Sequence, residues 1–307
     1  MRRPAYRIFR EGVPHHVFVR SIGGSMMFYS TEDCIFYVTL YACLARKYHA
    51  SVLGFSLMPN HAHSCESALD RQAFRSFHDE LNSKFTIGYN ELHDRKGPLL
   101  ESPFGFAAKT VGKKIRDNLC YIANNAIVGK LSPDILSYRW NLLSYYLSDH
   151  PFSEKLVLRD ASAPMRRAVT HVNYFRKHGI PLNGARQSLI YRGLDKEERR
   201  QILDYIISRY NCLDYPSMIA YYNGSFEQAC ISFRANSGSE HDIAEDYENY
   251  GIYVRMLQLA EKNGIDLKHC NFTRMNPETI GRLEFVFQHE GFPQRQIDRF
   301  LCKGGGG

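Results

Sequence analysis

The sequence has 307 residues, of which 44% are hydrophobic and 23% charged, so its apolar mass suffices for one or two folded domains and excludes a disordered chain. No stretch approaches the ~18 consecutive apolar residues of a membrane span, and the arginine-rich first ten residues have no apolar signal segment behind them. The net charge is +7, and residues 1–150, with 18 basic and 13 acidic residues, contribute +5 of it. We therefore expect no membrane association and a polyanionic partner for the first half of the chain.

Strand-like and helix-like segments alternate over the first ~110 residues. The pattern predicts a strand over 15–21, a helix from Ser30 or Thr31 to 49, strands over 51–57 and 61–67, a helix from Asp70 to about 94, and a strand over 104–109. Only the turn Met58–Pro59–Asn60 separates the second and third strands, so these two are expected to pair antiparallel. The order β-α-β-β-α-β is the ferredoxin-like or RRM-like order of the α+β class, and it leaves one face of the sheet open.

A helix over 111–130 follows, and beyond Trp140 the pattern becomes almost wholly helical. We expect a first domain over residues 1–150, a linker over 151–164, and an all-helical domain over 165–303 that supplies DNA recognition or partner contacts. Its clearest helices are predicted over 195–210, 244–262, 276–289 and 293–302. The last two predict an αα-hairpin, with a helix-turn-helix as the alternative. Gly304–Gly307 indicates a cloning remnant and is excluded from the fold.

Eight cysteines are scattered along the chain, without a CxxC pair or a cysteine and histidine cluster at zinc spacing. This pattern is typical of reduced thiols that serve as small core residues in a cytoplasmic protein. We therefore expect neither a disulfide framework nor a structural zinc site. The cysteines are Cys34, Cys43, Cys65, Cys120, Cys212, Cys230, Cys270 and Cys302.

His61 and His63 stand two residues apart at the start of the third predicted strand. Residues i and i+2 of a strand point to the same face, with Cα atoms about 6 to 7 Å apart. Two such imidazoles can converge on one divalent cation, although the same spacing also occurs among surface and core histidines. Glu66 is a further candidate for a ligand or an acid-base group, but strand alternation places it on the opposite face.

Tyr121 and Asn125 lie four residues apart in the helix predicted over 111–130, so they share one helical face. If that face looks at the open side of the sheet, the helix brings a phenol and an amide oxygen to the two histidines. Asn124, three residues after Tyr121, competes with Asn125 for the role of the amide ligand. With 20 tyrosines and 13 histidines in the chain, structural roles for these residues are the alternative.

Four short motifs resemble those of the REP-associated tyrosine transposases, a branch of the single-tyrosine HUH transposases of insertion sequences. Met58–His63 (MPNHAH) is similar to the family's MPNHVH signature, and Tyr121–Asn125 (YIANN) is similar to its YIELN helix. Gly97–Leu99 resembles its GPLW turn, and Tyr138–Tyr145 resembles its W-S-S-Y segment. The resemblance covers about residues 13–147.

The sequence also departs from the family pattern. Ala126 stands where the family usually has proline, Leu100 where it usually has tryptophan, and Ser64–Glu66 replaces a more apolar strand end. None of these changes removes a proposed ligand or the tyrosine.

What the resemblance implies is a metal-dependent DNA transposase or strand transferase that acts on single-stranded or hairpin-bearing DNA. Tyr121 would be the nucleophile. Its 5′-phosphotyrosine intermediate would retain the energy of the cleaved phosphodiester bond, so rejoining would need no ATP. His61, His63 and Asn125 would hold one divalent cation, and this mixed nitrogen and oxygen set suits Mg²⁺ or Mn²⁺. The protein would be a monomer or homodimer in the cytoplasm, associated with the nucleoid.

Basic residues of the first half are expected to hold the DNA backbone electrostatically. They are Arg2, Arg3, Arg7, Arg10, Arg20, Lys109, Lys113, Lys114 and Arg116. The main alternative is a domesticated nucleic-acid-binding or regulatory protein on the same fold without catalysis, which loss of a site residue would indicate. All four proposed site residues are present. A small-molecule metal hydrolase would need a convergent acid or Ser/His set near His61, and the sequence shows none.

Overall fold

The computed structural model describes residues 8–101, 104–238 and 248–303. The described part contains four strands, β1 (His15–Arg20), β2 (Ser51–Met58), β3 (His61–Ser67) and β4 (Gly105–Ala108). The helices of the first half are α1 (Thr31–Lys47), α2 (Arg71–Leu92) and α3 (Gly112–Val128). Those of the second half are α4 (Ala163–Lys177), α5 (Gly184–Tyr191), α6 (Lys196–Tyr210), α7 (Tyr215–Ile219), α8 (Phe226–Ala235), α9 (Gly251–Lys262), α10 (Pro277–His289) and α11 (Gln294–Phe300).

The four strands form one antiparallel sheet in the order β2-β3-β1-β4. Together with the chain order β1-α1-β2-β3-α2-β4, this arrangement confirms the predicted α+β class and its β-α-β-β-α-β order. The ends of these elements lie within about two residues of the predicted ends because local signals set them. Ser30, for example, accepts a hydrogen bond from the Asp33 backbone N–H, while the Asp33 carboxylate accepts the Ser30 N–H, so the two residues cap α1.

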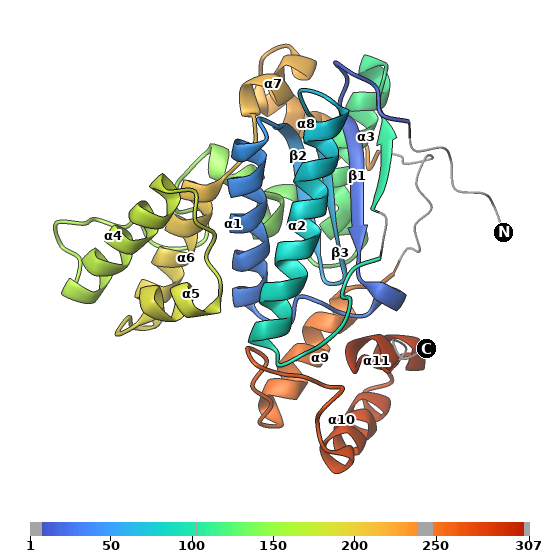
Figure 1. The fold of residues 1–307 in the computed structure, drawn as a ribbon, viewed down its shortest axis with the longest axis vertical. Helices are drawn as coiled ribbons and strands as arrows, with labels where there is room; N and C mark the ends of the chain where they lie inside the picture. The colour runs from blue at the N-terminus through green and yellow to red at the C-terminus, as the bar shows by residue number, and fades with distance from the viewer. Residues whose placement is uncertain (1–7, 102–103, 239–247, 304–307) are drawn as a thin grey trace.

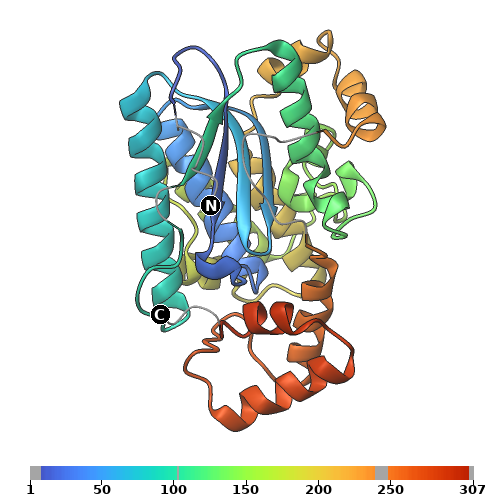
Figure 2. The same ribbon diagram turned by 90° about the vertical axis from the view of Figure 1, so that its right-hand side faces the viewer.

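Helices cover both faces of the sheet (Figures 1 and 2). α1 and α2 lie side by side on one face, whereas α3 packs over β2 and β3 on the other. The expectation of an open face is therefore wrong for this half of the sheet. Gly54 of β2 permits the close packing, since a Cβ there would lie 3.0 Å from Leu119 of α3.

The helices after residue 162 form three groups, and each shares a hydrophobic cluster with the first half of the chain. α4–α6 pack beside α1, whose Ile35 joins their cluster. α7 and α8 pack near α3 and β2, and Phe233 of α8 belongs to the main core. α9–α11 lie at one end of the sheet, where Met26 and Met58 join their cluster (Figure 2).

Residues 147–162 contain no helix or strand, at the position of the predicted linker. The three shared clusters show that the helices beyond it are not packed as a body apart from the sheet. Whether residues 1–150 and 165–303 fold separately stays a prediction. Gly304–Gly307 lies outside the described residues.

The helix predicted over 244–262 begins at Gly251 in the described part of the chain, because residues 248–250 are not helical and residues 244–247 lie outside the described ranges. The Gly251 N–H donates to the Gly129 carbonyl, 3.1 Å away, so contact with the end of α3 fixes the start of α9. No helix among the described residues is long and apolar enough to cross a membrane.

Candidate functional site

His61 and His63 lie on the α3 side of the sheet, as the strand spacing predicts, and their ring centroids are 4.7 Å apart. The turn before β3 orients the first ring. Asn60 Nδ2 donates to the Gly24 carbonyl, so Asn60 presents its Oδ1 to His61 Nδ1 at 2.6 Å. Because that oxygen can only accept, His61 carries a proton on Nδ1 and, when neutral, keeps its lone pair on Nε2.

His16 of β1 joins this pair, although it is not among the site residues predicted from the sequence. His16 Nε2 and His63 Nδ1 are hydrogen-bonded at 2.9 Å across the two paired strands. Histidines that bind metals are commonly oriented by a hydrogen bond to the other ring nitrogen. The available signal was the His15–His16 pair in a strand predicted to lie in the same sheet, but only the register shows which of the two faces His63.

Tyr121 lies beside His16 and His63, with ring centroids 5.7 and 5.6 Å from theirs. Its hydroxyl is buried and has no hydrogen-bond partner among the described residues. An unsatisfied buried hydroxyl costs ~1–3 kcal/mol, and such atoms are uncommon in folded proteins. The helix position predicted from sequence thus brings the phenol to the histidines.

The two neighbouring asparagines of α3 point to different surroundings. Asn124 Nδ2 donates to the carbonyls of Cys120 and Phe233, at 2.9 and 2.7 Å, so this side chain ties α3 to α8. Asn125 is buried one turn after Tyr121, and its Nδ2 has no hydrogen-bond partner in the part of the chain described. The Asn124 side chain is therefore committed to the contact with α8, whereas the choice of Asn125 as the ligand stays a prediction.

Glu66 does not belong to this site. It is fully buried on the opposite face of the sheet, where it accepts hydrogen bonds from Tyr41, Ser64 and His78. Burial opposes its ionisation, but the His78 charge and the three hydrogen bonds outweigh it and hold the pKa of the Glu66 carboxyl below its usual range. The alternative that Glu66 is a ligand or acid-base group at the histidines is wrong.

The predicted DNA-binding residues divide into four sets. Arg10, Lys113, Lys114 and Arg116 are exposed. Arg20 is paired with His61 in the β1–β3 register, and its buried Nε has no hydrogen-bond partner among the described residues. Lys109 is only 3% exposed, so burial argues against its predicted contact with a surface phosphate. Arg2, Arg3 and Arg7 lie outside the described residues.

The candidate site is closed. His61, His63 and Tyr121 are 3%, 1% and 4% exposed, respectively. The Tyr250 ring, just before α9, lies 5.5 Å from the His61 ring, and Gly238 packs against the α3 backbone at Tyr121. Both covering residues, Gly238 and Tyr250, belong to the helical region predicted over residues 165–303.

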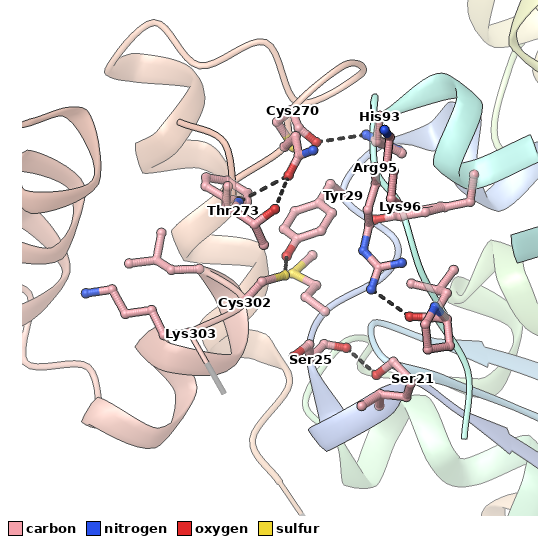
Figure 3. Close-up of a pocket in the computed structure, with 18 of the residues that line it drawn as sticks. Ser21, Ser25, Tyr29, His93, Arg95, Lys96, Cys270, Thr273, Cys302 and Lys303 are labelled. Atoms are coloured by element: carbon pink, nitrogen blue, oxygen red, sulfur yellow. Dashed lines mark hydrogen bonds between the residues drawn. The ribbon is translucent and has the colours of Figure 1, made fainter. Parts of the chain in front are cut away.

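A cavity of about 620 Å³ lies nearby, between the end of α2 and the segment that follows α9. Figure 3 shows Tyr29 directed at Cys302 and His93 bonded to the Cys270 carbonyl. Neither the site histidines nor Tyr121 line it. One hydrogen bond joins the wall of the cavity to the turn before β3. Ser21, which lines the cavity just after β1, donates its N–H to the Asn60 carbonyl at 3.0 Å.

No protein-family model matches the chain, and no curated protein matches it. Among solved structures, the chain is similar to that of a REP-associated tyrosine transposase bound to a REP hairpin. The similarity has a TM-score of 0.40 and 14% sequence identity, and it covers 45% of this chain and 81% of that chain. More than half of this chain therefore lies outside the similarity.

Proposed function

We propose that this protein cleaves and rejoins single-stranded or hairpin-bearing DNA, with Tyr121 as the nucleophile. The observation that carries the proposal is the buried Tyr121 hydroxyl, which lacks a hydrogen-bond partner among the described residues and lies beside His16 and His63. The motif resemblance around His61–His63 and Tyr121–Asn125 supports the same assignment.

In the proposed step, the Tyr121 oxygen forms a bond to phosphorus while the bond from phosphorus to the 3′ oxygen breaks. The DNA then carries a 5′-phosphotyrosine on one fragment and a free 3′-OH on the other, and attack by a 3′-OH reverses the step. Since only ~0.1% of an ordinary phenol is ionised at pH 7, a base must take the Tyr121 proton. The candidate for this base is His16, the imidazole beside Tyr121 that is not a proposed metal ligand.

The residues present fit a divalent cation of the Mg²⁺ or Mn²⁺ type. His61 and His63 offer ring nitrogens, and Asn125, one turn after Tyr121, offers its amide oxygen. No three His, Cys, Asp or Glu side chains of that part gather as a metal site, so water and phosphate oxygens would complete the coordination. Bound there, the cation would neutralise charge on the phosphate oxygens and orient them.

Arg20 is the protein's own cation at this site. It lies opposite His61 in the strand register, and its Nε lacks a hydrogen-bond partner in the described structure. A guanidinium in this position can bind a phosphate oxygen. DNA reaches Tyr121 only if Gly238 and Tyr250 move aside, so the proposal also requires a conformational opening.

The test is formation of a covalent adduct. The protein is incubated with Mn²⁺ and a hairpin-bearing oligonucleotide labelled at its 3′ end, because the fragment that stays on the tyrosine retains that end. Wild-type protein is expected to give a labelled band on a denaturing gel, and Tyr121→Phe is expected to lose it while thermal stability and DNA binding stay nearly unchanged.

Tyr145→Phe is the matched control. The Tyr145 hydroxyl donates to Asp204 at 2.7 Å, so its loss costs ~1 kcal/mol of stability without removing the adduct. Peptide mapping of the adduct to Tyr145 or Tyr146 would show that the nucleophile is misassigned.

A non-catalytic nucleic-acid-binding protein is the second candidate function, and the closed site favours it. Its signature is DNA binding by wild-type protein with no adduct at any Mn²⁺ or Mg²⁺ concentration. Opening the site separates the two candidates. Tyr250→Ala uncovers the His61 ring and raises the adduct yield of an enzyme, but it produces no adduct in a binding protein.

A further inference from the structure

The basic charge is concentrated in the three-helix group α4–α6. Residues 163–210 contain ten Lys or Arg and four Asp or Glu, a net charge of +6, compared with +5 for residues 1–150 and −4 for residues 211–307. Asp204, one of the four acids, is fully buried and bonded to Arg139 and Tyr145. Glu197, another, pairs with Arg200 at 3.0 Å. The outer surface of this group is therefore strongly positive.

The outward face of α4 is the most regular part of this surface. Its inner face buries Met165, Ala168, Val169 and Val172. After the exposed Ala163 at its start, its exposed residues are Arg166, Arg167, Thr170, Asn173, Tyr174 and Lys177, with no carboxylate among them. At 15 residues α4 is about 22 Å long, and it lies at the edge of the molecule, away from the sheet (Figure 1).

The cations of α4 are held by neutral partners, so their charge is not compensated. Arg166 donates to the Ala161 carbonyl, and Arg167 donates to the Arg192 carbonyl at 3.1 Å. No ion pair forms between Arg166, Arg167 or Lys177 and a carboxylate of the described chain. Contacts to carbonyls orient a guanidinium while leaving its charge available to an anion.

We propose that this face of α4 binds double-helical DNA, such as the stem of a hairpin. An α-helix fits the B-DNA major groove, which is ~12 Å wide. Arg166, Arg167 and Lys177, at the two ends of α4, would contact phosphates, and the hydrogen-bonding side chains of Thr170 and Asn173 lie between them. The proposal rests on the proposed function for its choice of DNA as the polyanion, and it adds a second contact surface outside residues 13–147.

Duplex rather than single-stranded DNA fits because the face offers few stacking platforms. Tyr174 is the exposed aromatic residue on it, and its ring is tilted against the His178 ring, with centroids 4.3 Å apart. Proteins that bind single strands present successive aromatic rings to successive bases.

The experiment compares two full-length variants of equal charge change. In the test variant Arg166, Arg167 and Lys177 are changed to Gln. In the control variant the exposed Arg255, Lys262 and Arg282 of α9 and α10 are changed to Gln. Fluorescence anisotropy measures the affinity of each for a hairpin with an unpaired 5′ flank and for the flank alone, across a range of salt concentrations.

The test variant is expected to bind the hairpin at least 10-fold more weakly at about 0.1 M salt. Loss of three phosphate contacts lowers the slope of log affinity against log salt by about 2 to 3. Binding of the flank alone and adduct formation on an unstructured oligonucleotide stay unchanged, and the control variant behaves as wild type.

Equal loss in both variants, or unchanged hairpin affinity in the test variant, overturns the proposal. Competition by polyglutamate as effective as competition by duplex DNA also overturns it, because the face would then bind acidic protein. Arg166→Lys with Arg167→Lys keeps the charge and is expected to retain binding, which separates the proposal from misfolding. If hairpin binding depends on α4 but no adduct ever forms, the proposed catalytic function fails while this inference stands.

Discussion

The site histidines are oriented by neighbouring side chains that are not themselves proposed metal ligands. Asn60 fixes the ring of His61, and His16 bonds the ring of His63. Such outer contacts typically change metal affinity by 10- to 100-fold when removed. The predicted ligands therefore depend on Asn60, in the turn before β3, and on His16 for their orientation.

Asparagine 125 provides a sharp test of the metal proposal because its neighbour serves as the control. Asn125→Ala is expected to weaken Mn²⁺ binding at least 10-fold and to abolish the adduct. Asn124→Ala removes hydrogen bonds to α8, so it lowers stability by ~1–2 kcal/mol and leaves Mn²⁺ affinity unchanged. Titration calorimetry with Mn²⁺ measures both, and the reverse order of effects would assign the ligand to Asn124.

Histidine 15, on the other face of the sheet, predicts a pH dependence of stability. Burial lowers the pKa of His15 from 6.5 to about 4, and its Nε2 accepts the Arg10 N–H. Between these two pH values His15 is protonated in the unfolded chain and neutral in the folded chain. The free energy of unfolding therefore falls as the pH drops from about 6.5 to 4.

Urea unfolding at a series of pH values measures this effect. His15→Gln removes the titrating group, and it is expected to flatten the profile between pH 6.5 and 5. Below about pH 4.5 the Glu66 carboxyl adds a second loss, because its folded pKa is lowered and its stabilisation disappears on protonation. A wild-type profile with no slope between pH 6.5 and 5 would contradict the assignment.

At the scale of elements, the position of Tyr121 depends on how closely α3 approaches β2. Gly54→Leu would place a side chain where Leu119 and Ile122 already pack, so it is expected to lower stability by ~1–3 kcal/mol and to displace Tyr121 from the histidines. Gly105→Leu is the control in the same sheet, since its nearest neighbour would lie 3.7 Å away. Thermal unfolding and Mn²⁺ affinity are the measurements, and equal loss in both variants would mean that the α3 contact is not the cause.

The elements of the first half follow from local sequence signals. The His61–Ser67 strand begins and ends as predicted, because a Pro–Asn turn precedes it and polar residues follow it. The start of α9 did not follow in the same way, since a contact between Gly251 and Gly129 fixes it. Propensity decides where a helix can form, and tertiary contacts decide where it begins.

At the scale of the whole molecule, the buried His93 ring links Asp33 of α1 to the segment before α10 by hydrogen bonds. His93 Nε2 lies 2.7 Å from the Asp33 carboxylate, and its Nδ1 donates to the Cys270 carbonyl at 3.0 Å. His93→Ala removes one hydrogen-bond partner of the buried Asp33 carboxylate and is expected to cost ~1–3 kcal/mol. Thermal unfolding measures the loss.

Arg274→Ala is the control, because Arg274 pairs with the exposed Asp94 at the same junction and surface pairs contribute under ~1 kcal/mol. If both variants lose little, the junction is held by its apolar cluster alone. If His93→Ala also raises the adduct yield, the α9–α11 group limits access to the site.

The sequence by itself determined the order of strands and helices, the shared face of His61 and His63, and the helical phase of Tyr121. These follow from periods of 2 and 3.6 residues, which act over a few neighbours. Only the tertiary structure decided that His16 faces His63, that Asn124 rather than Asn125 is bonded to α8, and that Tyr250 covers the site. Those outcomes depend on strand register and on packing between residues more than 100 positions apart, which no local pattern encodes.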